Sequence, residues 1–448
     1  MRIARCLLPL LLVCAGCTPP SPTVTAPDAT PGVPTSASSA PAAPSQDPAA
    51  PPTAGPAPTP PSPEQAQSLA AGSNAFAMDL YTRLRKQPGN LAMSPASITL
   101  ALAMTWGGAK GPTSDEMAKV LHLPNAKDAT IDAAGRQLAV WNDPARTVYT
   151  LRVANRLFGE KSYTFEAAYL KKTGEAFGAP LEPVDFKGAA EPARERINGW
   201  VAKETRDRIK NLLPPRSIDK ETRLVLVNAI YFLGDWQSPF SKDRTRPAPF
   251  FTTATTSKDV PTMSQIASFK HAAVDGLQVL EMPYVGGELA MTFVLPDAKD
   301  GLDALEQKLT DGKLTSWIAA AKPERVLVSL PVFEIDPAEP LSLGKELVGM
   351  GMKLAFDPDR ADFTGIASPP SPADRLYIGK VFHKAFVKVN EKGTEAAAAT
   401  AVVMPRAGSA APAPPPEFRA DHPFLFFLRD VRTGMILFMG RVAEPAKA

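Results

Sequence analysis

Residues 390–418 read NEKGTEAAAATAVVMPRAGSAAPAPPPEF and form the most informative segment of this 448-residue chain. Small side chains follow Gly393, and an arginine stands at position 406. Successive side chains of an extended strand point to opposite faces, and here both faces would carry small or uncharged residues except at Glu395. Such a strand can lie between two others without burying a second charge. The segment therefore suits insertion into a sheet.

The same segment also permits another conformation. Glu395 and the four alanines after it favour a helix that Thr394 would cap. The β-branched residues within 400–403 favour a strand, and Pro405 ends either element. Gly393 has the backbone freedom that a hinge needs. We therefore expect a hinged segment with two accessible states.

Residues 1–17, MRIARCLLPLLLVCAGC, have the pattern of an export signal, because two arginines precede an apolar run too short to span a bilayer. Their end resembles a bacterial lipoprotein cleavage box, in which Cys17 would be lipidated and become the first mature residue. Cys14 stands where an aliphatic residue is usual, so a plain secretory signal is the alternative. With Cys6, these are all the cysteines, so we expect no disulfides. We expect export, either to a membrane anchor at the cell envelope or to the extracellular space.

Residues 18–63 form the next region, with 16 prolines, no Lys or Arg, and only Asp28 and Asp47 as acids. Such a composition cannot bury enough apolar surface to fold, so we expect a disordered linker. Proline-rich chain extends by about 3.1 Å per residue, which gives this linker a reach on the order of 100 Å. The whole chain has 49 basic and 46 acidic residues, and this balance indicates no nucleic-acid partner.

Residues 64–448 carry the patterns of one large α+β domain. Apolar residues recur at helical spacing over 66–87, and Pro88 follows. Residues 222–236, TRLVLVNAIYFLGDW, form a nearly continuous apolar run that is typical of a strand buried on both faces. Further single strands are expected at ELAMTFVLP (288–296), RVLVSLPVFEI (325–335), FVKVN (386–390), PFLFFLRD (423–430) and GMILFMGRV (434–442).

Enzyme motifs are missing from the sequence. The four histidines, His122, His271, His383 and His422, match neither H-E-x-x-H nor a Cys/His zinc pattern. No G-x-S-x-G elbow occurs, and WGGAKGPTS (106–114) lacks the G-K-[ST] order of a phosphate loop. We therefore expect no enzyme, no metal site and no cofactor.

Several motifs in family order make residues 64–448 resemble a serpin, a member of the serine protease inhibitor superfamily. Lys392 stands in the hinge motif where an acid is commoner. The motifs are NLAMSPASITLALAMTWGGAKGPTSDEM (90–117), LRVANRLF (151–158), INGWVAKETRDRIKNLLP (197–214), TRLVLVNAIYFLGDWQSPF (222–240), VPTMSQ (260–265), FHKAFVKVNEKGTE (382–395) and DHPFLFFLRDVRTGMILFMGRV (421–442).

The resemblance implies a fold of three β-sheets and about nine helices, with an exposed reactive-centre loop at about 391–418. It implies a suicide inhibitor: a target serine protease forms an acyl-enzyme on the loop, and the cleaved loop then enters the large sheet as a new strand. We expect a monomer. A non-inhibitory serpin that acts as a carrier, chaperone-like protein or substrate is the alternative, as is an inhibitor of a cysteine protease.

The resemblance also assigns roles to residues by motif. The polar cluster beneath the sheet, called the shutter, would be Ser94, Ser97, Asn228 and His383, and Trp236 would mark the breach where insertion begins. The hinge would comprise Glu391, Gly393, Thr394, Glu395, Ala396, Ala397, Ala398, Ala399 and Thr400, and Thr394 would be the first side chain to be buried.

Family spacing places the attacked residue thirteen or fourteen positions after Gly393. The Arg406–Ala407 bond, which we prefer from the sequence, would suit a trypsin-like protease. Ala407–Gly408 would suit an elastase-like protease and is the alternative. The part of the loop after this bond is about five residues longer than the family resemblance implies.

Overall fold

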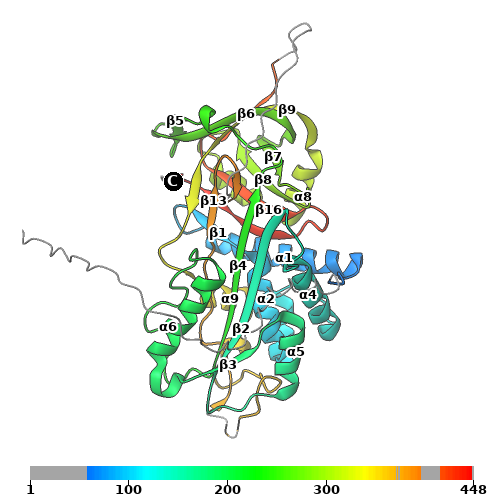
Figure 1. The fold of residues 1–448 in the computed structure, drawn as a ribbon, viewed down its shortest axis with the longest axis vertical. Helices are drawn as coiled ribbons and strands as arrows, with labels where there is room; N and C mark the ends of the chain where they lie inside the picture. Colours follow the sequence, from blue (N-terminus) through cyan, green and yellow to red (C-terminus); the bar gives the residue numbers. More distant parts are fainter. Residues whose placement is uncertain (1–57, 370, 372–373, 395–413, 446–448) are drawn as a thin grey trace, which may run out of the picture. The chain divides into compact units, whose positions relative to one another are not determined.

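The structure is a computed structural model that describes residues 58–369, 371, 374–394 and 414–445. The contacts divide the chain into two units, Met1–Thr53 and Ala54–Ala448, and every described residue belongs to the second unit. This described part folds as a mixed α+β structure with nine α-helices and three β-sheets (Figure 1). The predicted fold class is therefore confirmed.

Helix α1 (Pro63–Leu84) begins with local signals that the sequence contains. The hydroxyl of Ser62 accepts from the amide of Gln65, and the Gln65 side chain accepts from the amide of Ser62. Pro63 occupies the first helical position, where its missing N–H leaves no bond unmade. The helix covers most of the predicted pattern and starts one residue before the boundary expected at Glu64.

Helix α2 (Pro95–Gly107) lies at the centre of the core. It contacts α1, α3, α4 and α5, and it also contacts β4 and β17 from the two large sheets. All but two of its residues are buried, as expected for a helix that is apolar around its circumference. The remaining helices are α3 (Gly111–Val120), α4 (Lys127–Trp141), α5 (Ala167–Phe177), α6 (Phe186–Glu204), α7 (Leu302–Lys308), α8 (Asp311–Ala320) and α9 (Gly344–Met350).

The six-stranded sheet has the strand order β10-β13-β14-β4-β2-β3. Alternate residues of β4 face opposite sides: Val227 and Ala229 join a cluster with α6, whereas Ile230 and Phe232 join the main core. Figure 1 shows β2 and β4 running side by side as the two long strands of this sheet. Its strands are β2 (Tyr149–Glu160), β3 (Leu181–Val184), β4 (Leu224–Asp235), β10 (Phe333–Ile335), β13 (Val387–Val389) and β14 (Gly393–Thr394).

The nine-stranded sheet follows the order β1-β17-β16-β8-β7-β6-β9-β15, and β5 pairs with β6 beside this path. A separate two-stranded sheet joins β11 (Leu341–Ser342) to β12 (Phe382–His383). The strands of the nine-stranded sheet are β1 (Leu91–Met93), β5 (Arg246–Phe251), β6 (Ser257–Val274), β7 (Leu277–Pro283), β8 (Leu289–Pro296), β9 (Lys322–Pro331), β15 (Glu417–Arg419), β16 (Phe424–Asp430) and β17 (Ile436–Val442).

Two strand predictions need correction. The apolar run 325–335 is not one strand: β9 ends at Pro331, β10 begins at Phe333, and the two belong to different sheets. Val332 makes the transition, with its amide bonded to the carbonyl of Pro261. The strand predicted over 222–236 exists as β4, but its first three residues are only half-buried, because one edge of the strand faces a cavity.

Two absences concern only the part of the chain that the structure describes. No helix there is long and apolar enough to cross a membrane. No group of His, Cys, Asp and Glu side chains there is arranged to hold a metal ion.

Candidate functional site

The beginning of the predicted hinge lies inside the six-stranded sheet. The chain leaves β13 at Val389, turns, and returns as the two-residue strand β14. Thr394 is paired antiparallel with Val389 on one side and with Gly234 of β4 on the other. Gly393 pairs in the same way with Asp235 of β4. Two hinge residues therefore already stand between β13 and β4.

The turn that precedes β14 is held by side chains. Oδ1 of Asn390 accepts from the amides of Lys392 and Gly393, at 3.0 and 3.3 Å. Oε1 of Glu391 accepts from the hydroxyl of Thr245 at 2.8 Å. These contacts fix the point at which the chain re-enters the sheet.

Gly393 is required here by close approach. A Cβ atom at this position would overlap the carbonyl oxygen of Gly234 and lie 2.8 Å from the Cα of Asp235. Its φ is outside the left-handed region. Backbone freedom, the reason that the sequence suggests for this glycine, is therefore not what the observed conformation demands.

Thr394 is buried, with 5% of its surface exposed, and its hydroxyl lies 2.6 Å from the hydroxyl of Tyr284. Tyr284 is fully buried, and burial raises the pKa of its hydroxyl well above the ordinary range. Two rings hold it: Trp236 stacks on it at a centroid distance of 4.4 Å, and Phe232 meets it edge-on at 4.9 Å.

Trp236 lies where the resemblance places it, beside the hinge. Its indole Nε1 donates to the carbonyl of Asn390 at 3.0 Å, and its amide donates to the carbonyl of Lys392 at 2.6 Å. Trp236 thus contacts the turn before β14 directly. It also supports Thr394, the last residue of β14, through the ring of Tyr284. Its role in insertion stays a prediction.

The four predicted shutter residues are brought together under β4. The hydroxyl of Ser97 donates to Oδ1 of Asn228, and the amide of Ser97 donates to the hydroxyl of Ser94 at 3.2 Å. Nδ2 of Asn228 continues the chain of bonds to Oδ1 of Asn155 at 2.6 Å. This polar network links α2 to β4 and β2. Its effect on strand separation stays a prediction.

His383 joins the same network as a neutral imidazole. Its Nε2 accepts from the amide of Ser94 at 2.9 Å, so the ring nitrogen at this position carries no proton. Burial lowers the pKa of His383 to about 4, because the charged form would lose its hydration. The ring therefore remains neutral at physiological pH and can keep this bond.

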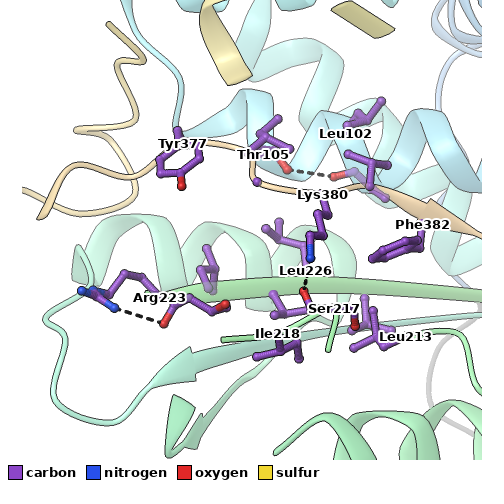
Figure 2. A pocket seen from close by; sticks show the side chains of 18 of the residues that line it. Leu102, Thr105, Leu213, Ser217, Ile218, Arg223, Leu226, Tyr377, Lys380 and Phe382 are labelled. Atoms are coloured by element: carbon purple, nitrogen blue, oxygen red, sulfur yellow. Dashed lines mark hydrogen bonds between the residues drawn. The ribbon is translucent and has the colours of Figure 1, made fainter. Parts of the chain in front are cut away.

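A cavity of about 340 Å³ lies beside the free edge of β4. Among the described residues, no strand pairs with this edge over 224–233, whereas the other edge is paired with β2. Figure 2 shows Leu226 of β4 on one side of the cavity and Lys380 and Phe382 on the other. The ammonium of Lys380 donates to the carbonyl of Ser217 at 3.2 Å. The cavity borders β4 over 224–228, on the edge that β14 pairs with only at Gly234 and Asp235.

Several predicted site residues lie outside the described residues. They are the remaining hinge residues Glu395, Ala396, Ala397, Ala398, Ala399 and Thr400, the candidate cleavage residues Arg406, Ala407 and Gly408, and the candidate lipidation residue Cys17. Their assigned roles stay predictions.

Four residues of the site were not expected from sequence: Tyr284, Asn155, Asn390 and Thr245. Tyr284 lies 110 positions before the hinge residue that it contacts, and Asn155 lies 73 positions before Asn228. Asn390 alone had a local signal, because an Asn that precedes a glycine by three residues is suited to a turn.

The fold and hinge define a class of mixed α+β protein with three sheets, in which the short strand β14 pairs between β13 and β4. Comparison with known families agrees: the model of the family described as Serpin (serine protease inhibitor) matches residues 71–445. The chain belongs to the serpin family.

Individual relatives extend this result. The chain is 42% identical over 392 residues to the leukocyte elastase inhibitor of Sus scrofa, with 85% of this chain and all of that protein covered. It is 40% identical over 397 residues to Serpin B3 of Homo sapiens, with coverages of 84% and 100%.

Solved structures of both loop states resemble this one. Uncleaved ovalbumin matches with a TM-score of 0.74 and 33% identity, over 84% of this chain and all of that one. Cleaved Serpin 42Da matches with a TM-score of 0.75 and 30% identity, over 86% and 100%.

Proposed function

We propose that this protein is an irreversible inhibitor of serine endopeptidases that acts by inserting its cleaved loop into the six-stranded sheet. The observation that carries this proposal is the position of β14, which stands between β13 and β4. Among the described residues the same edge of β4 is unpaired over 224–233, and a cavity borders it over 224–228. A strand that continued from Thr394 along this edge would satisfy the free backbone groups of β4.

In this mechanism the target protease attacks a bond within 395–413 with its catalytic serine and forms an acyl-enzyme. Cleavage separates the two ends of the loop and frees the part attached to Thr394. Insertion of that part along β4 carries the acylated protease with it and competes with hydrolysis of the acyl-enzyme. The small side chains after Thr394 favour insertion, since few large or charged groups have to be buried.

The names of the relatives suggest which class of protease this protein inhibits. Leukocyte elastase inhibitors are among the proteins most similar to this chain. An elastase-like protease would accept Ala407 as the attacked residue. We therefore propose attack at Ala407–Gly408 by an elastase-like protease, in place of the preference for Arg406–Ala407 and trypsin. A small alanine side chain is compatible with the small specificity pocket of elastase.

We further propose that residues 1–17 direct export and that Cys17 carries a lipid, as in bacterial lipoproteins, so that 18–63 tether the inhibitor to a membrane. The cleavage-box pattern and the proline-rich composition support this proposal. Mass spectrometry of the mature N-terminus tests it directly. A lipid-sized mass on Cys17 that disappears in Cys17→Ser is the expected result, and an unmodified mature protein would refute it.

A carrier that does not inhibit proteases is the competing function, and the name of one solved relative says that it binds a small molecule. Human thyroxine-binding globulin, complexed with thyroxine, matches with a TM-score of 0.75 and 27% identity. The small residues of the hinge in this chain favour inhibition, because their burial on insertion into the sheet costs little free energy.

The deciding experiment is incubation of the full-length protein with pancreatic elastase and, separately, with trypsin. The products are then separated on a denaturing gel. A band at the summed mass that survives detergent would demonstrate covalent trapping. Cleavage of the loop without such a band would mean that the protein is a substrate, and the inhibitor proposal would fail.

A further inference from the structure

We infer that the hydroxyl of Tyr284 is the catch that keeps the hinge two residues inside the sheet before any protease arrives. This inference rests on the proposed function, which it extends by naming a positioning residue for loop insertion. Its basis is the buried bond of 2.6 Å between the hydroxyls of Tyr284 and Thr394.

The Tyr284 hydroxyl depends on this one contact. The residue has no exposed surface, and within the described part of the chain Thr394 is the sole hydrogen-bond partner of its hydroxyl. A buried hydroxyl without a partner is unfavourable, because it has lost its bonds to water and gained none. Departure of the hinge would leave Tyr284 in that condition.

The tyrosine cannot follow the hinge outward, because its ring is fixed on several sides. Trp236 stacks on it with an interplanar angle of 19°, and Phe232 contacts it edge-on. Gly234 also leaves it room: a Cβ atom there would lie 2.7 Å from Cζ of Phe232 and 3.1 Å from Cδ1 of Tyr284. The hydroxyl therefore stays at a fixed point and selects the position of Thr394.

Such a catch matters because the protease is trapped only if loop insertion is faster than hydrolysis of the acyl-enzyme. With Thr394 already paired to β13 and β4, insertion starts from an existing strand end and only has to propagate. A hinge that left the sheet would have to find its register again after cleavage. Loss of the catch should therefore slow trapping without slowing the first cleavage.

The geometry also predicts which residues can replace Thr394 without loss of this bond. Threonine and serine supply a hydroxyl at the required place, whereas valine has the shape of threonine but no hydrogen-bonding group. Thr394→Val should consequently behave like Tyr284→Phe, and Thr394→Ser should keep the catch. If the two hydroxyls act only through each other, the double variant should be no worse than either single variant.

The experiment makes two measurements on the full-length wild type and on four variants of it. These are Tyr284→Phe, Thr394→Val, Thr394→Ser and the double variant Tyr284→Phe/Thr394→Val. Hydrogen exchange of the amides at 234–236 and 390–394 reports the hinge position without any protease. The second measurement is the ratio of cleaved inhibitor to covalent complex formed with pancreatic elastase. Tyr169→Phe is the matched control, because it removes another buried hydroxyl, bonded to the carbonyl of Met104 far from the hinge.

The expected result is about fivefold faster exchange at the hinge and an approximately fivefold higher ratio of cleavage to trapping in Tyr284→Phe and Thr394→Val, the factor that loss of one ordinary hydrogen bond produces. Tyr169→Phe and Thr394→Ser should match the wild type in both measurements. Unchanged exchange in Tyr284→Phe would overturn the catch, and faster exchange with an unchanged ratio would overturn its role in trapping. If the wild type forms no complex with either elastase or trypsin, the proposed function fails while the exchange measurement still decides whether Tyr284 holds the hinge.

Discussion

The imidazole of His383 accepts a hydrogen bond from the backbone amide of Ser94 at 2.9 Å, and this bond joins β12 to the start of α2 beneath the free edge of β4. Only a neutral ring can accept at Nε2, and burial keeps the ring neutral by lowering its pKa to about 4. A proton on this nitrogen would replace an acceptor by a donor that faces another donor.

Stability should therefore depend on pH through His383. The unfolded chain takes up a proton near the ordinary pKa of 6.5, whereas the folded protein resists it until about pH 4. Stability is thus fully present above pH 6.5 and falls as the pH drops from 6.5 to 4, by up to about 3 kcal/mol. Denaturant unfolding of His383→Gln at several pH values should lack this part of the decline. His122→Gln, which changes an exposed histidine, should retain it.

Thr394→Arg should convert an inhibitor into a substrate. The side chain at 394 points to Tyr284 in the core, and the neighbouring carboxylate of Asp235 belongs to the opposite face of the sheet, where it cannot pair with the new charge. Burial of an unpaired guanidinium is strongly unfavourable. On a denaturing gel we expect cleavage products and no covalent complex with the protease. A stable complex in the same amount as with the wild type would contradict the insertion mechanism.

Gly393→Ala should push the hinge out of the sheet, because the added methyl group would meet the carbonyl of Gly234. Overpacking of this kind costs about 2 kcal/mol, which corresponds to an approximately thirtyfold shift toward the expelled hinge. Hydrogen exchange at 234–236 should become faster to a similar degree. Gly312→Ala is a suitable control, since a Cβ atom at 312 meets nothing within 4 Å. Equal exchange in the two variants would show that the close approach at 393 does not hold.

The two candidate bonds can be distinguished by fragment mass. Attack at Ala407–Gly408 should release a C-terminal fragment that begins at Gly408, and Arg406→Ala should then leave elastase trapping intact. Ala407→Asp should abolish it, because an elastase pocket does not accept a charged side chain. A fragment that begins at Ala407, with loss of trypsin trapping in Arg406→Ala, would instead support the trypsin-like assignment.

The C-terminal strand is anchored by a buried ion pair between Arg441 of β17 and Glu306 of α7, at 3.0 Å. The hydroxyl of Tyr81 also donates to Glu306, at 2.6 Å. Glu306→Ala would remove the counter-ion of the buried guanidinium of Arg441, which would keep only backbone carbonyls as acceptors, and should destabilise the protein by about 3 kcal/mol. Glu444→Ala breaks a pair at the surface and should cost less than about 1 kcal/mol. Denaturant midpoints of the two variants check this contrast.

Local chemistry determined much of the fold in advance. The capping residues before α1 and the continuous apolar runs of β8, β16 and β17 act over a few neighbouring positions, and these elements appear where the pattern places them. The run over 325–335 was different, because its periodicity continues through Val332 while the chain moves from one sheet to another. Pro331, at which β9 ends, is the one local sign of a break, but it does not indicate that the next strand belongs to another sheet.

For the functional site, too, some features were predictable from local sequence and others depended on the tertiary structure. By itself, the sequence predicted that 390–400 can serve as a hinged strand, since glycine, threonine and alanine have small side chains at positions that would enter a sheet. Only the tertiary structure decided that Gly393 and Thr394 already stand between β13 and β4, that Tyr284 meets Thr394, and that β4 borders a cavity over 224–228. The physical reason is distance along the chain. These contacts join segments up to 160 residues apart, and their energy depends on close approach and burial, which no short stretch of sequence contains.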